Sequence, residues 1–176
     1  MLASMNELDE FWRQMIAEAT RRARTDGRGD VADYLALKAS NDALRAAGCR
    51  WLFESFVELS DEANRQGVQL TVENENPHRF AADKATMVGS LINFRRGLRS
   101  LTIEAGWTRT PHDGFMRGGA LARARITHFG ISRANAELVL LNSADHAPQW
   151  FAVAPDGKRN PISAQALREH FQLFLN

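Results

Sequence analysis

The stretch EAGWTRTPHDGFMRGG, residues 104 to 119, carries the most chemically mixed side chains of the sequence. An imidazole beside a carboxylate can act as an acid and a base, so His112 and Asp113 are the candidate catalytic residues. Arg109 and Arg117 flank them, and guanidinium groups bind phosphate or carboxylate through two parallel hydrogen bonds. The stretch contains no evident nucleophile, so binding is favoured over catalysis.

The candidate ligand site extends from this stretch into the strand that follows it. It comprises seven residues: Glu104, Trp107, Arg109, His112, Arg117, Arg123 and Arg125. Arginines on one sheet face repel each other unless an acid or an anion lies between them. We favour Glu104 as the acid that balances Arg125. The alternative is a pocket in which Arg109, Arg117, Arg123 and Arg125 together hold an anion.

Much of the segment at residues 107 to 118 is explained by turn formation alone. Pro111 fixes a backbone angle, Asp113 can cap a turn through its side chain, and Gly114 tolerates positive φ. We expect Trp107, Phe115 and Met116 to pack this segment against the body of the protein as an ordered loop.

No metal or cofactor site is expected from the sequence. The five histidines lack the spacing of metal ligands, and the phosphate-loop, zinc-helix, nucleophile-elbow and calcium-loop motifs are all missing. If a metal were bound, the ligands would be His78 or His112 together with Asp113 and Glu104. The single cysteine, Cys49, lies on an apolar helical stretch and is expected to be a buried small residue.

Two helices are predicted at the N-terminal end of the chain, before these residues. Residues 6–25 form an amphipathic pattern that ends in TDGRGD, where Asp30 can cap a second helix at 31–66. The second helix carries a seam with heptad-like spacing, which favours a homodimer formed through the N-terminal helices. The seam residues are Tyr34, Leu37, Asn41, Leu44, Gly48, Trp51, Ser55 and Leu59. The apolar residues between 51 and 59 are too numerous for a solvated helix and are assigned to the core.

After Gly67 the pattern alternates as in β-strands, near residues 68–73, 87–95, 98–106, 120–129, 136–142 and 149–154. A turn at Arg96 and Gly97 predicts a hairpin in which Phe94 faces Arg99 and Ile92 faces Leu101.

The alternation also assigns faces to the strand at 120–129. Its inward residues are predicted to be Ala122, Ala124, Ile126 and His128, and its outward residues Arg123, Arg125 and Thr127. His128 and His170 are expected at the core or its boundary, with their ring nitrogens hydrogen-bonded. A last helix is predicted to begin after an N-cap at Ser163.

The predicted fold class is α+β, because strands and helices do not alternate along the chain. It consists of an N-terminal two-helix hairpin packed on a mostly antiparallel five- or six-stranded sheet, with a C-terminal helix. Residues 1–67 would form the helical hairpin, a candidate dimerisation element, and residues 68–176 the sheet and last helix, together one cooperative domain.

Composition limits how the protein can fold and in which cellular compartment it is expected. The 176 residues carry a net charge of +1, and 44% of them are hydrophobic. Such a chain builds a core without metal or disulfide support and has no overall attraction to polyanions. The lone cysteine and the absence of a long apolar run predict a cytoplasmic protein that does not enter a membrane.

The leading functional hypothesis is a non-enzymatic binding or assembly protein, homodimeric through its helices. It would engage an anionic ligand or a protein partner through the Arg-rich sheet face and the loop at 107–118. One alternative is a small enzyme that acts on a phosphorylated or carboxylated substrate through His112 and Asp113. A second is a nucleic-acid-binding module, for which Phe129 is the one assigned aromatic on the arginine-bearing face.

Overall fold

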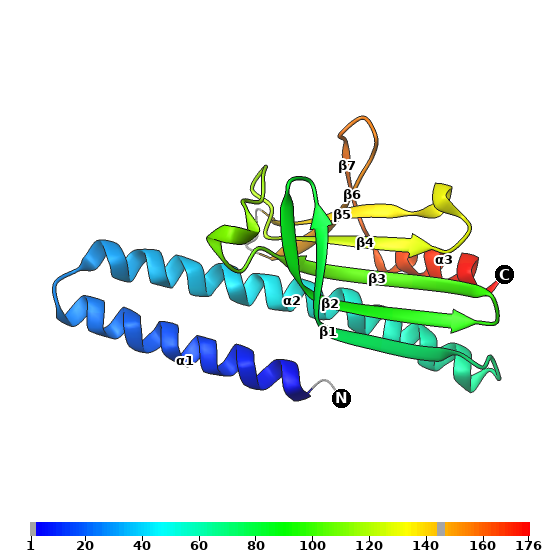
Figure 1. Cartoon of the computed structure of the whole chain (residues 1–176), viewed down its shortest axis with the longest axis horizontal. Coiled ribbons are helices and arrows are strands. Elements are labelled where there is room, and N and C mark those ends of the chain that lie inside the picture. Colours follow the sequence, from blue (N-terminus) through cyan, green and yellow to red (C-terminus); the bar gives the residue numbers. More distant parts are fainter. Residues whose placement is uncertain (1–2, 144–146) are drawn as a thin grey trace. The chain divides into compact units, whose positions relative to one another are not determined.

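The computed structural model describes residues 3–143 and 147–176, with side chains from residue 10 onward. His146 lies outside the described residues. The chain divides into two compact units, one ending at Leu44 and the other beginning at Arg45. The first is helical, and the second contains the sheet (Figure 1).

The first unit contains helix α1 (Ala3–Thr25) and the start of helix α2 (Gly29–Arg65). Gly27 has φ of +70° in the connecting turn, where the Arg28 amide donates to the carbonyl of Ala23 at 2.8 Å. Because α2 begins at Gly29, Asp30 lies inside its first turn, so the predicted N-cap position is wrong. None of the described helices combines the length and apolarity that a membrane crossing requires.

The second unit contains one antiparallel sheet in which seven strands follow one another in sequence order. The strands are β1 (Thr71–Ala82), β2 (Ala85–Arg96), β3 (Arg99–Trp107), β4 (Ala122–His128), β5 (Ala136–Asn142), β6 (Pro148–Val153) and β7 (Arg159–Pro161). The α+β class is confirmed, but the predicted count of five or six strands is wrong. The short β7 is exposed throughout and ends in proline, so its sequence lacks the alternation that marks a strand.

The predicted hairpin between β2 and β3 exists, but its register differs from the prediction by two residues. Phe94 lies opposite Leu101, and Ile92 lies opposite Ile103. The turn is Gly97 and Leu98 rather than Arg96 and Gly97, because the strands extend through the pair Arg96 and Arg99. A shift of two residues preserves the faces, so the apolar face was identified correctly.

The inner face of the sheet is covered by the second half of α2 and by helix α3 (Ala164–Leu175) (Figure 1). Phe94 of the sheet lies 6.3 Å from Phe56 of α2 and 5.8 Å from Phe171 of α3, between ring centroids. The indole of Trp150 donates to the carbonyl of Gly48 at 2.8 Å. The predicted core assignment of this part of α2 is confirmed for Leu52, Phe56 and Leu59, which are buried, but is wrong for Trp51, which is exposed.

Two further predictions are confirmed at this face. The burial of β4 alternates as expected, with Ala122, Ala124, Ile126 and His128 buried. The hydroxyl of Ser163 accepts a hydrogen bond from the Ala166 amide at 3.2 Å and caps α3.

The distal part of the β1–β2 hairpin turns away from the plane of the other strands (Figure 1). Here Gly89 lies opposite Gly106, and a Cβ added at Gly89 would come within 1.9 Å of the carbonyl oxygen of Ala105. The two backbones can approach this closely only because both positions are glycine. Beyond this point Phe80, Ala82, Ala85 and Met87 form a small separate core, against which Met116 packs.

Candidate functional site

The centre of the outer sheet face is a network of ion pairs around Glu104. One carboxylate oxygen lies 2.8 Å from Nε2 of His78, and the other accepts from Arg125 at 2.8 Å. The side chains of Glu104 and His78 are only 12% and 15% exposed. The predicted pairing of Glu104 with Arg125 is confirmed, and it follows from their opposition on β3 and β4.

Two further acids extend this network. The other ring nitrogen of His78 lies 3.0 Å from Glu75, and Arg125 also donates to Glu137 at 2.6 Å. A third Arg125 nitrogen donates to the carbonyl of Ala81 at 3.2 Å. Burial lowers the pKa of His78, but its hydrogen bonds with the two glutamates outweigh burial and raise the pKa. The network therefore stabilises a protonated His78.

Arg123, the other outward arginine of β4, contacts the tip of the β1–β2 hairpin. Its guanidinium lies 2.8 Å from Asp83, a turn residue with φ of +55°. Its Nε is enclosed and has no hydrogen-bond partner in the described part of the chain. Arg123 and Arg125 thus both bind the folded-over hairpin, through Asp83 and the Ala81 carbonyl.

Asp113 is a structural residue of the loop between β3 and β4. Its buried carboxylate accepts hydrogen bonds from the backbone amides of Arg109 and Thr110, from the Thr110 hydroxyl, and from Arg79 at 2.6 Å. The hydrogen bond from the Thr110 amide is the largest of several contributions that lower its pKa. His112 is exposed beside it, and these hydrogen bonds do not connect the two side chains. The geometry gives no support to an acid and base pair.

The prediction that the other apolar residues of the loop pack against the body of the protein is correct only in part. Trp107 is buried, and the guanidinium of Arg109 lies 3.6 Å from the centroid of its ring. Met116 contacts the small outer core as expected, whereas Phe115 is 84% exposed, so its predicted packing role is wrong. Arg117 is exposed.

Three of the predicted anion-binding arginines therefore each contact a different partner within the protein. Arg109 stacks on Trp107, Arg123 pairs with Asp83, and Arg125 pairs with two glutamates. Sequence reasoning missed four contacting partners, Glu75, Arg79, Asp83 and Glu137. The strand register alone could have identified Glu137, which lies opposite Arg125. Of the metal set proposed from the sequence, His78 and Glu104 do meet, but no group of three or more His, Cys, Asp or Glu side chains among the described residues is arranged to hold a metal ion.

His128 and His170 form a pair between β4 and α3. Nε2 of His128 lies 3.0 Å from Nδ1 of His170, and the rings stack with centroids 5.3 Å apart. The prediction of buried or boundary histidines is confirmed, and one ring nitrogen of each takes part in this contact. Burial lowers the pKa of His128 to about 4 and also lowers that of His170. Both imidazoles are therefore neutral near pH 7.

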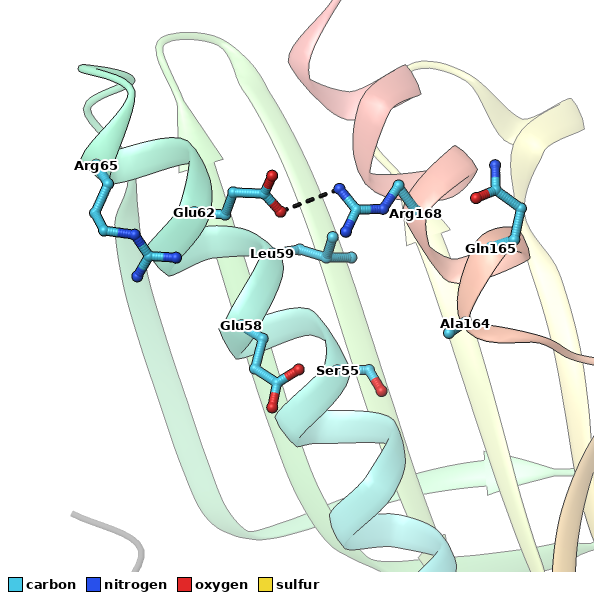
Figure 2. Close-up of a pocket in the computed structure, with 8 residues that line it drawn as sticks. All are labelled: Ser55, Glu58, Leu59, Glu62, Arg65, Ala164, Gln165 and Arg168. Carbon is cyan, nitrogen blue, oxygen red and sulfur yellow. Dashed lines mark hydrogen bonds and ion pairs between the residues drawn. The ribbon is translucent and has the colours of Figure 1, made fainter.

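An open groove of about 460 Å³ lies between α2 and α3 (Figure 2). It is lined by Ser55, Glu58, Leu59, Glu62, Arg65, Ala164, Gln165 and Arg168. Glu62 and Arg168 face each other across it and form an ion pair of 3.0 Å (Figure 2). Two acids and two bases line the groove together, so it has no charge preference for either an anion or a cation.

The first unit exposes a concentration of large apolar side chains. We define the apolar helical patch as Phe11, Trp12 and Met15 of α1 with Tyr34 and Leu37 of α2. Their exposed fractions range from 47% to 67%. Among residues 10–44 of the same unit, those buried are Ile16, Ala23 and Ala32, two of which are alanines. Within residues 10–44 the helices therefore bury mainly small residues and leave Phe11, Trp12 and Tyr34 exposed to water.

Comparisons of the chain with protein-family models, with curated proteins and with solved structures find no match. Function must therefore be argued from the residues themselves.

Proposed function

We propose that the protein is a non-catalytic assembly protein that forms a homodimer through its N-terminal helices. The apolar helical patch is the observation that carries this proposal. Single exposed apolar residues are ordinary on protein surfaces, but five large ones within one two-helix unit favour a surface that binds protein. Aromatic residues and methionine are also enriched at protein interfaces.

The contacts of the sheet face also favour the helices, rather than the sheet, as the surface for assembly. Arg123 and Arg125 are engaged by Asp83, Glu104 and Glu137, so an anionic ligand would have to displace internal acids. The enclosed Nε of Arg123 is out of reach from solvent. These contacts favour a structural role for the two arginines, and a ligand on the Arg-rich face stays a prediction.

The two alternatives draw less support from the observed contacts. An enzyme using His112 and Asp113 would need the carboxylate to orient the imidazole, but Asp113 is bound to the loop backbone and to Arg79. A nucleic-acid platform needs several exposed aromatics beside free arginines. Of the three aromatics weighed for this role from the sequence, Phe94 and Trp150 are buried and Phe129 is exposed.

The proposal is tested by measuring mass in solution across a dilution series, for example by sedimentation equilibrium. We expect a dimer for the natural sequence and at least tenfold weaker association for Trp12→Glu, since a charge would then be buried in the interface. Leu98→Glu is the matched control, because Leu98 is 94% exposed but lies outside the patch. A monomer at every concentration, or equal weakening by both substitutions, would overturn the proposal.

A further inference from the structure

The charges of α1 have a regular arrangement along the helix. Acids occupy positions 7, 9, 10 and 18, and arginines occupy positions 13, 21, 22 and 24. Each acid has an arginine at the position obtained by subtracting its number from 31: Glu7 with Arg24, Asp9 with Arg22, Glu10 with Arg21, and Glu18 with Arg13. If the direction of α1 is reversed about a point between Met15 and Ile16, each of these charged positions therefore falls on a position of opposite charge.

We infer that α1 pairs antiparallel with α1 of a second copy, about a twofold axis near Met15 and Ile16. This inference rests on the proposed function and specifies its geometry. In such a pair every charged residue of one helix lies at the level of an opposite charge on the other. A parallel pair would instead place acid at the level of acid and arginine at the level of arginine. Opposite charges across an interface set orientation more than affinity.

The apolar residues of α1 fit the same arrangement. Trp12, Met15 and Ala19 are spaced to share one side of the helix, with Phe11 beside them. In the antiparallel pair, Trp12 of one copy lies at the level of Ala19 of the other, and Phe11 at the level of Thr20. Large side chains thus oppose small ones, as close packing of two helices requires.

The helix dipole explains part of the charge pattern without any partner. Acids near an N-terminus and bases near a C-terminus stabilise a single helix. Contacts within the helix also occur, since Glu10 pairs with Arg13 and Glu18 pairs with Arg22. Neither the dipole nor these pairs account for the exposed Phe11 and Trp12 between the charged ends. An antiparallel partner accounts for all of these features.

Charge reversal at one end of α1 tests the geometry. The first variant carries Glu7→Lys, Asp9→Lys and Glu10→Lys, and the second carries Arg21→Glu, Arg22→Glu and Arg24→Glu. In an antiparallel pair each variant places like charges at the same level, so we expect its homodimer to dissociate with at least a tenfold higher Kd. In a parallel pair each variant merely replaces one like-charge contact by another, and its Kd would stay near that of the natural sequence.

Two further measurements separate this effect from damage to the helix. An equimolar mixture of the two variants and a variant with all six reversals should both regain dimer, although the six reversals oppose the helix dipole. The control variant carries Glu54→Lys, Glu58→Lys and Asp61→Lys, which are exposed on α2 and change the net charge by the same amount as the first variant. Circular dichroism checks the helix content of each protein.

The outcomes distinguish the orientation from the proposed function. If Trp12→Glu disrupts the dimer but the single-end reversals leave its Kd unchanged, the antiparallel geometry is wrong while assembly through the patch stands. Loss of dimer in the six-reversal variant also contradicts the geometry if its helix content is preserved. If the natural sequence is monomeric, the proposed function fails together with the geometry.

Discussion

The pair formed by His128 and His170 makes folding stability depend on pH between about 6.5 and 4. The contact at 3.0 Å requires one ring nitrogen to donate a proton and the other to accept it. A proton on the accepting nitrogen would leave two donors facing each other in a site where His128 is only 3% exposed. The folded protein therefore resists protonation of this pair.

The size of the effect follows from the pKa difference. His128 has a pKa of 6.5 when unperturbed and about 4 in the folded protein. As pH falls through 6.5 the unfolded chain binds a proton that the folded chain does not, so stability is present above pH 6.5 and is lost toward pH 4. Between pH 8 and pH 5 the loss from His128 alone is about 2 kcal/mol. The lowered pKa of His170 acts in the same direction.

Urea unfolding at pH 8 and pH 5 measures this difference. His128→Gln places a non-titrating amide near the position of Nε2, and we expect it to reduce the difference between the two pH values by about 2 kcal/mol. His112→Gln makes the same change at an exposed histidine and should retain the full difference. Comparison with the natural sequence removes the opposite contribution of His78, whose pKa is raised. An unchanged pH dependence in His128→Gln would refute the reasoning.

Two other substitutions test the folded-over hairpin, each by its free energy of unfolding. Gly89→Ala forces a Cβ against the Ala105 carbonyl and should cost at least about 2 kcal/mol, whereas Gly29→Ala meets no atom within 4 Å and should be nearly neutral. A stable Gly89→Ala protein would contradict the close approach. Glu104→Gln weakens two partly buried pairings and should cost about 1–3 kcal/mol, whereas Glu73→Gln, in an exposed pair, should cost under about 0.5 kcal/mol. Equal effects would contradict a central role for Glu104.

The features predicted correctly from sequence are those that depend on local periodicity. Alternation along β4 identified the buried side of the strand, and the spacing before α3 identified Ser163 as its cap. Both signals lie within a few neighbouring residues and survive an error in register. The pairing of Glu104 with Arg125 was also accessible, because it needs only the correct order of adjacent strands.

The features that were missed depend on residues far apart in the sequence. The pairing of Arg123 with Asp83 and of Arg79 with Asp113 exists because the β1–β2 hairpin bends over the outer face. That bend depends on Gly89 lying opposite Gly106, and a prediction with the register shifted by two residues does not place them together. Arg123 therefore had no evident partner in the sequence, because Asp83 comes from a distant turn.

The position of the aromatic residues in α1 is hard to explain by the stability of a single chain. Phe and Trp are poorer helix formers than Ala, Glu or Arg, so Phe11 and Trp12 cost helix stability where they stand. They regain little by burial, since they are 57% and 55% exposed. On the outer face of the sheet, by contrast, His78, Glu104, Arg123 and Arg125 all have internal charged partners. A surface that is unfavourable in isolation belongs with an interface, which is why we locate assembly in the helices rather than on the sheet.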